Sequence, residues 1–250
     1  MKRLLHAFIM CQSMFCSIPL PKKLAYIWDE KARPLMLLFL PVVGLEMGLI
    51  WAGIAWLCQY FGVPQLVTGL ILCVYSYMVT GFIHLDGFID VKDAVGSCRD
   101  LEKRRAILKD SHVGAFAVIG CVLLLLADFA FLASASGDFR ILILIPVVSR
   151  CGSSLAVTTL RPISVSQYAG AFKEGVTKAQ PVILSVMLAA ALAVGFVLCG
   201  KYAFALVAEV IAYALALRKG FRSLDGMNGD ISGYALTLSE LAAVAVFALL

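Results

Sequence analysis

Long apolar runs separated by short polar connections make up most of the chain. Runs of about 20 residues are what an α-helix needs to cross the hydrocarbon core of a bilayer. The predicted spans are Pro34–Leu57, Pro64–Ile83, Val113–Ser136, Phe139–Leu160, Pro181–Gly200, Tyr202–Leu217 and Ile231–Leu250. The sixth is short, so we expect it to be tilted or partly buried. The pattern predicts an all-α, polytopic integral membrane protein with about seven transmembrane helices, and residues 1–250 form one domain.

Residues 1–33 precede the first predicted span and have a different pattern. They open with Met-Lys-Arg, and their short apolar run is interrupted by His6 and Gln12. A signal peptide would need an unbroken apolar core followed by a small-residue cleavage site. We therefore expect an amphipathic segment on the cytoplasmic leaflet, with its lysines facing anionic lipid.

Lys and Arg alternate between the two sides of the predicted spans. Six lie in residues 1–33, six in residues 84–112 and three each in residues 161–180 and 218–230, against two in the connections on the other side. The positive-inside rule then places the N-terminus in the cytoplasm and the C-terminus outside. The three longest connections share the cytoplasmic side, so an active site is expected to open there.

The composition supports a membrane protein, with 62% hydrophobic and 15% charged residues and a mean hydropathy of +0.94. The net charge of +5 is read as an orientation signal. Because no Lys/Arg-rich groove with interleaved aromatic residues is present, nucleic acid is not an expected partner. The eight cysteines lack C-x-x-C spacing and are expected to be reduced and structural. A homo-oligomer is compatible with this pattern.

Three carboxylates stand where the second span ends. In a helix that starts at Asp86, the side chains of Asp86, Asp90 and Asp93 share one face, because their spacing is i, i+4, i+7. Oxygen-only ligands favour Mg²⁺ or Mn²⁺. The other reading is an acidic helix start, with Asp86 as N-cap and the others solvated. His84 joins this face only if the backbone bends near Gly87 or the helix starts at Asp86.

Basic residues follow the carboxylates in the same connection, which suits a pyrophosphate substrate. Lys109-Asp110-Ser111 lies against the start of the third span, where backbone N–H groups favour a phosphate. For Lys103–Arg105 we favour a membrane-anchoring role. Near the end of the chain, Asp230 either caps the last span or forms a second pole of the site.

Five ionisable residues fall inside predicted spans, namely Glu46, Asp128, Arg150, Glu209 and Glu240. Each costs roughly 2.5–3.5 kcal/mol at the bilayer centre, so each should face protein or water. Asp128 and Glu209 lie toward the far half of their spans and are expected at the interface. Arg150 is expected to pair with a carboxylate or a phosphate.

The run His84-Leu85-Asp86-Gly87-x-x-Asp90-x-x-Asp93, followed by Lys109-Asp110-Ser111-x-Val113-Gly114-x-Phe116, resembles the cobalamin synthase family. Phe15-x-x-Ile18-Pro19-x-Pro21 and Gly226-x-x-Gly229-Asp230-x-x-Gly233 extend the likeness, in the same order, over nearly the whole chain. The sequence departs from the family at several positions: His112 for Arg, Asn228 for Thr, Asp225 and Ala94 for Gly, and Gly170 after Tyr168 for Arg. These departures weaken the expectation of basic substrate contacts at 112 and 170.

The resemblance implies an adenosylcobinamide-GDP ribazoletransferase of the bacterial inner membrane that needs Mg²⁺ and performs the final step of cobalamin nucleotide-loop assembly. The 3′-hydroxyl of α-ribazole, or of its 5′-phosphate, attacks the cobinamide-side phosphorus of adenosylcobinamide-GDP, and GMP leaves. Asp86, Asp90 and Asp93 are expected to hold Mg²⁺. The catalytic residues are expected to be His84, as general base, and Asp86. The expected substrate contacts are Arg99, Lys109, Asp110, Ser111, Arg150, Gly229 and Asp230.

Other membrane functions are alternatives to this one. A CDP-alcohol phosphatidyltransferase motif has Ala-Arg where this chain has Asp90-Val91, and prenyl transferases need a second dense Asp-rich motif. A transporter would place its ionisable residues along a path near the bilayer midplane. The dense cluster at one membrane face favours an enzyme that uses a cytoplasmic substrate.

Overall fold

The computed structural model describes residues 2–163 and 174–250, which are helical apart from their connections and one isolated bridge. The elements are α1 Lys2–Phe15, α2 Lys22–Ala25, η1 Arg33–Leu35, α3 Met36–Tyr60, α4 Gln65–Met78, α5 Ile83–Gly96, α6 Leu101–Ile107, α7 Ala115–Ser134, η2 Phe139–Ile143, α8 Ile145–Thr159, α10 Ala179–Cys199, η3 Gly200–Ala203, α11 Phe204–Leu224 and α12 Gly229–Leu249. The predicted all-α class is confirmed.

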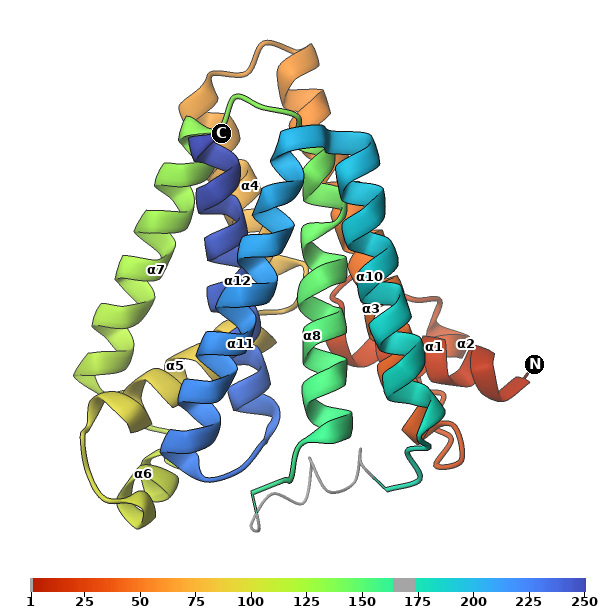
Figure 1. Ribbon diagram of the computed structural model, residues 1–250, viewed down its shortest axis with the longest axis vertical. Coiled ribbons are helices and arrows are strands. Elements are labelled where there is room, and N and C mark those ends of the chain that lie inside the picture. Colours follow the sequence, from red (N-terminus) through yellow and green to blue (C-terminus); the bar gives the residue numbers. More distant parts are fainter. Residues whose placement is uncertain (1, 164–173) are drawn as a thin grey trace.

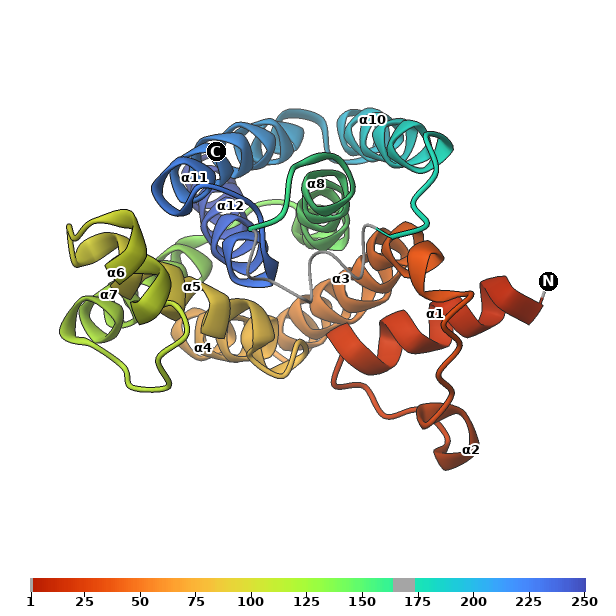
Figure 2. The same ribbon diagram turned by 90° about the horizontal axis from the view of Figure 1, so that it is seen from below.

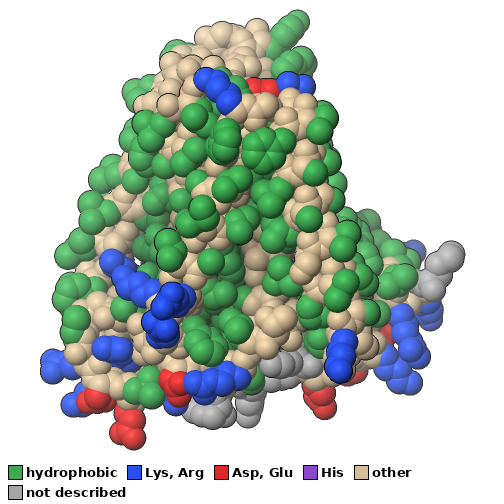
Figure 3. Space-filling view, in the orientation of Figure 1, with side chains coloured by type: hydrophobic (Ala, Val, Ile, Leu, Met, Phe, Trp, Pro, Cys, Tyr) green, Lys and Arg blue, Asp and Glu red, His purple; other side chains and the backbone are tan. Residues whose placement is uncertain are grey.

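The long helices run side by side, and α1, α5 and α6 gather at one end of the bundle, which we call the polar end (Figure 1). Seen from that end, α8 and α12 lie inside, with α3, α5, α10 and α11 around them (Figure 2). On the face shown in Figure 3, Lys, Arg, Asp and Glu side chains concentrate at the polar end below a broad apolar band. This division matches the charge asymmetry of the sequence.

Five helical segments in the described residues are long and apolar enough to cross a membrane, or six if the bent pair α4–α5 counts as one span. One segment, Ala179–Leu224, contains both α10 and α11. These two helices run antiparallel, joined by η3 at the end opposite the polar end (Figure 1). A multi-pass membrane protein is therefore supported, while the number seven and the side of the N-terminus stay predictions.

The second predicted span is wrong at its C-terminal end. Pro64–Ile83 was expected to be one helix, but α4 ends at Met78 and α5 leaves it at an angle of 84°. Gly81 and Phe82 both have left-handed backbones, with φ of 60° and 63°, so the α-helix cannot continue through them. The helix carrying the aspartates therefore starts at Ile83 rather than Asp86, and it lies at the polar end.

Three of the five ionisable residues of the spans are buried, as the sequence predicts for charges within a bilayer, and Glu46 and Glu240 are half-buried. Arg150 is 2% exposed, Asp128 4% and Glu209 0%. Asp128 and Glu209 are enclosed by neighbouring helices, and their expected interfacial depth stays a prediction. All eight cysteines are free thiols, and six of them are buried.

Candidate active site at the crossing of α5 and α12

The site is built around a close crossing of α5 over the start of α12. A Cβ placed on Gly87 would lie 2.9 Å from both the Cα and the carbonyl oxygen of Asp230. A second close approach follows one turn further along α12, where a Cβ on Gly233 would lie 3.0 Å from the carbonyl oxygen of His84. Two glycines, one on each helix, thus let the two backbones meet and bring Asp230 beside the carboxylates of α5.

The carboxylates of this crossing influence one another. Asp86 is exposed, whereas Asp90 and Asp93 are half-buried. Burial and, to a smaller extent, the negative charges of Asp86, Asp230 and Asp93 together raise the pKa of the Asp90 carboxyl from 3.8 to about 6. The three residues predicted from spacing, together with Asp230, therefore form one electrostatic unit, which we call the acidic crossing.

Asn228, rather than Asp230, caps the last helix. The Asn228 side-chain oxygen accepts a hydrogen bond from the backbone N–H of Ile231 at 2.9 Å, and its amide nitrogen donates to the Asp230 carboxylate at 2.6 Å. The capping role considered for Asp230 is therefore wrong. Asn228 both ends the loop and fixes the direction of the Asp230 side chain, whereas Gly229 is an exposed backbone position beside them.

The donor atoms of the acidic crossing suit a hard divalent cation. In residues 2–163 and 174–250, no group of three or more His, Cys, Asp or Glu side chains is arranged closely enough to hold a metal unaided. Mg²⁺ commonly takes only one or two carboxylates and completes its coordination with water and substrate phosphates. The four carboxylates repel one another. Among the described ion pairs, none gives Asp86, Asp90 or Asp93 a cationic partner. This arrangement suits a Mg²⁺ ion that shares its coordination with substrate phosphates.

A cleft of about 540 Å³ opens beside Asp86. Its wall is formed by the end of α1 and the residues that follow it, and by the bend between α4 and α5. The lining residues are Ser13, Met14, Cys16, Ser17, Thr80, Gly81, Phe82, Ile83 and Asp86. Two hydrogen bonds hold this wall together: the Ser17 hydroxyl donates to the Met78 carbonyl at 2.7 Å, and the Ser17 N–H donates to Val79 at 2.8 Å. The left-handed bend at Gly81 and Phe82 is thus part of the cleft.

His84 is half-buried in the first turn of α5. Its ring stacks on Phe15 with centroids 6.5 Å apart, and the Thr237 hydroxyl donates to its carbonyl oxygen at 3.2 Å. Its Nδ1 is buried without a hydrogen-bond partner. Burial, and secondarily the positive charge of Arg150, lowers the pKa of His84 to about 3, so the imidazole is neutral near pH 7.

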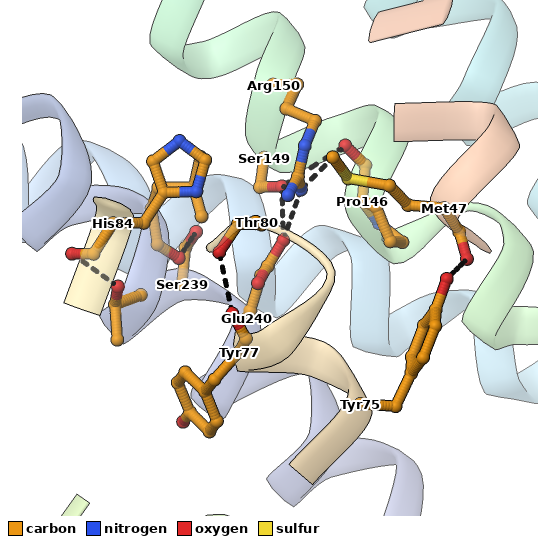
Figure 4. A network of polar contacts seen from close by, with 12 residues as sticks. Met47, Tyr75, Tyr77, Thr80, His84, Pro146, Ser149, Arg150, Ser239 and Glu240 are labelled. Atoms are coloured by element: carbon orange, nitrogen blue, oxygen red, sulfur yellow. Dashed lines mark hydrogen bonds and ion pairs between the residues drawn. The ribbon is translucent and has the colours of Figure 1, made fainter. Parts of the chain in front are cut away.

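Arg150 is committed to a buried ion pair. Its Nη1 donates to the Glu240 carboxylate at 2.6 Å and to the Ser149 hydroxyl at 3.1 Å, and Ser149 in turn donates to Glu240 at 2.7 Å (Figure 4). The sequence predicts that Arg150 pairs with a carboxylate or a phosphate, and the described partner is a carboxylate, that of Glu240. Figure 4 draws this pair and His84 in one close-up, with no dashed line joining them.

The predicted phosphate-binding loop lies next to Asp93. Lys109, Asp110 and Ser111 are exposed in the connection before α7. A Cβ on Gly114, the N-cap of α7, would overlap the carboxylate of Asp93, so this carboxylate lies at the N-terminal end of α7. Arg99 is exposed between α5 and α6. Gly170, which stands where the resembled family often has Arg, lies outside the described residues.

One arrangement was missed by the sequence analysis. Arg105 of α6 donates from Nε to the carbonyl of Leu224 at 3.0 Å and from Nη2 to that of Asp225 at 3.0 Å, which caps α11. Asp225 has a left-handed backbone with φ of 56°, and its carboxylate pairs with Arg105 and Arg161. The departure from glycine at this position therefore provides a carboxylate that joins three connections at the polar end.

Comparison with known proteins adds to this geometry. The family model described as Cobalamin-5-phosphate synthase matches residues 7–248. A Clostridium perfringens (strain SM101 / Type A) protein named adenosylcobinamide-GDP ribazoletransferase is 38% identical over 98% of both chains. Proteins of the same name from Clostridium botulinum (strain Alaska E43 / Type E3) and Brevibacillus brevis are 32% and 29% identical over 96% and 97% of both chains. No solved structure matches the chain.

Proposed function

This chain belongs to the cobalamin-5-phosphate synthase family, and we propose that it joins adenosylcobinamide-GDP to α-ribazole, or to α-ribazole 5′-phosphate, with release of GMP. The observation that carries the proposal is the match over residues 7–248, with relatives of that name covered over nearly their whole length. The reaction completes the assembly of cobalamin. It needs a site that neutralises a diphosphate and accepts an alcohol, and the acidic crossing beside an open cleft suits both needs.

Mg²⁺ is part of this proposal. One or two of the carboxylates of the acidic crossing (Asp86, Asp90, Asp93 and Asp230) would bind it together with substrate phosphates, and Asn228 fixes the Asp230 carboxylate for this role. When bound, Mg²⁺ supplies charge neutralisation for the diphosphate and for the GMP that leaves. Without a cation the four carboxylates would repel the anionic substrate.

The two substrates differ in size, and this difference supports an assignment of the cleft. Ligand pockets are commonly about 300–1,000 Å³, and the 540 Å³ cleft beside Asp86 suits a nucleoside such as α-ribazole better than a corrinoid. The corrinoid diphosphate would lie over the open face of the polar end. Exposed Lys109 and Arg99 would contact its phosphate oxygens, and Ser111 would donate a hydrogen bond to them.

The group that removes the hydroxyl proton is a separate question. His84 is neutral at pH 7 and has an unpartnered Nδ1, as a base requires. A general base works best with a pKa near the operating pH, and the pKa of His84 is about 3 whereas that of Asp90 is about 6. If His84 is the base, His84→Gln changes the pH dependence of the reaction rate. An unchanged pH dependence would mean that another group removes the hydroxyl proton and that His84 has a positioning role.

The proposed location is the bacterial inner membrane with the polar end in the cytoplasm. The concentration of Lys and Arg in connections at that end supports this orientation. Soluble substrates would then reach the acidic crossing from the side on which they are made.

The function is tested with protein purified in detergent, so that no transmembrane gradient exists. GMP release is measured with adenosylcobinamide-GDP, Mg²⁺ and either α-ribazole or its 5′-phosphate. Asp86→Asn and Asp90→Asn should abolish GMP release, whereas Glu102→Gln should not. Glu102 is a matched control because it is an exposed carboxylate on α6 without a described hydrogen bond or ion pair. Absence of GMP release by the wild-type protein with both acceptors would refute the function.

A further inference from the structure

A second cavity lies on the opposite side of α5 from the cleft. It has a volume of about 330 Å³ and is formed by α5, α7, α11 and α12. Its walls are apolar except for two lysines, Lys92 of α5 and Lys219 of α11. No element of the proposed reaction uses this cavity, which we call the two-lysine groove.

The groove is polar at one end and apolar along its length. Lys92 lies on α5 at the polar end, and Lys219 lies about 7 Å before the last residue of α11, since a helix rises about 1.5 Å per residue. Leu123 lies about 12 Å beyond the start of α7, and Leu238 about 13 Å beyond the start of α12. The groove therefore runs from the level of the polar connections into the apolar band of the bundle.

Gly120 of α7 leaves room for the side chain of Lys92 to pack across it. A Cβ on Gly120 of α7 would lie 2.7 Å from Cγ and 2.8 Å from Cε of Lys92, so the aliphatic stem of the lysine lies directly across this glycine. Such a path buries the methylene groups and keeps the ammonium at the polar boundary. Neither Lys92 nor Lys219 has an ion-pair partner among the described residues.

We propose that the two-lysine groove binds one anionic phospholipid, with the phosphate between Lys92 and Lys219 and an acyl chain along Leu123, Leu238 and Leu241. The charge complementarity is direct, because two unpaired ammonium groups face a site with no carboxylate in its lining. The change from cationic to apolar along the groove matches the change along the lipid itself. A soluble anion would satisfy only the lysines, and an apolar protein helix only the leucines.

The lipid would contact the helix that carries the active-site aspartates. Phe88 of α5 stacks on Tyr234 of α12, with ring centroids 5.8 Å apart and planes at 12°, and both rings line the groove. A bound lipid would therefore lie against the same two helices that form the acidic crossing, on their other side.

The test is native mass spectrometry of the full-length protein released from detergent, with phosphatidylglycerol or phosphatidylcholine added. Lysines near an anionic surface each contribute roughly fivefold in affinity. The variant Lys92→Gln/Lys219→Gln should therefore bind phosphatidylglycerol about ten- to thirtyfold more weakly than wild type. Phosphatidylcholine should bind the wild type more weakly than phosphatidylglycerol does.

Two further variants separate a groove from general surface charge. Lys23→Gln removes an exposed lysine of α2 and should leave phosphatidylglycerol binding at the wild-type level. Leu123→Trp keeps both lysines but fills the groove at a residue that is 62% exposed, so it should fold and lose the lipid. Equal retention in wild type and the double-lysine variant would overturn the proposal. So would an equal loss in Lys23→Gln, or displacement of the lipid by the same concentration of inorganic phosphate.

Discussion

Replacing Gly87 by Ala should lower the enzymatic activity strongly while leaving the protein folded. The new Cβ would lie 2.9 Å from the Asp230 backbone, and ordinary contacts begin at 3.4 Å, so α5 and α12 must separate by at least 0.5 Å. The neighbouring atoms belong to the backbone of a long helix and cannot rotate away as a side-chain tip can. The separation moves Asp86 and Asp90 away from Asp230.

The expected loss of activity is large relative to the loss of stability. A misplacement of about 1 Å at a catalytic site can cost about a hundredfold in rate, so we expect roughly a ten- to hundredfold fall in GMP release. Overpacking costs about 1–3 kcal/mol, and the better helix propensity of Ala offsets about 1 kcal/mol of it. The protein should therefore stay folded, with a small decrease in unfolding temperature in detergent.

The matched control is Gly53→Ala. Gly53 also lies within a long helix, α3, but a Cβ added there has no neighbour within 4 Å. This variant should keep wild-type activity and gain up to about 1 kcal/mol of stability from the helix propensity of Ala. Wild-type GMP release by Gly87→Ala would refute the claim that the close approach of α5 to α12 sets the geometry of the site.

Three further predictions concern single features of the polar end. The unfolded chain releases the Asp90 proton near pH 4 and the folded chain holds it to about pH 6. The stability of the metal-free protein should therefore fall as pH rises through this window, and thermal unfolding of Asp90→Asn should show a smaller fall. Asn228→Ser should keep the helix cap within a few tenths of a kcal/mol but lower Mg²⁺ affinity about ten- to hundredfold, because the donor to Asp230 is lost; unchanged affinity in a metal titration would contradict the positioning role. Arg105→Ala should cost about 1.5–3 kcal/mol by removing charged hydrogen bonds to the end of α11, whereas Lys103→Ala, in an exposed pair with Asp100, should cost at most about 1 kcal/mol. Equal shifts in unfolding temperature for these two variants would refute the capping role of Arg105.

The sequence predicted those features that depend on composition and local spacing. Apolar runs of bilayer length predicted the membrane helices, and the i, i+4, i+7 spacing predicted that the carboxylates of α5 share one face. The resemblance to the cobalamin synthase family, carried by the motifs at His84–Asp93 and Lys109–Phe116, is confirmed by the family match. The roles assigned to individual site residues stay predictions.

The features that were wrong or missed depend on contacts between distant segments. Hydropathy continues without interruption through Val79–Ile83, so it cannot reveal a bend produced by left-handed backbones at Gly81 and Phe82. Asn228 and Asp230 are equally good capping residues by type, and the structure shows that Asn228 makes the cap hydrogen bond.

Similarly, the guanidinium of Arg105 meets carbonyl groups 119 and 120 residues further along the chain. A local pattern of three basic residues gives no sign of that partner. The burial of Glu209 is of the same kind, because hydropathy fixes the depth of a residue in its span but not the helix it faces.

Binding of Mn²⁺, a paramagnetic substitute for Mg²⁺, tests the acidic crossing most directly. Electron paramagnetic resonance titration of the purified protein, with adenosylcobinamide-GDP present, should show bound Mn²⁺ in the wild type and in Glu102→Gln. The signal of bound Mn²⁺ should be lost in Asp90→Asn and in Asp230→Asn. Undiminished Mn²⁺ binding by these two variants would contradict the assignment of the metal to the crossing of α5 and α12.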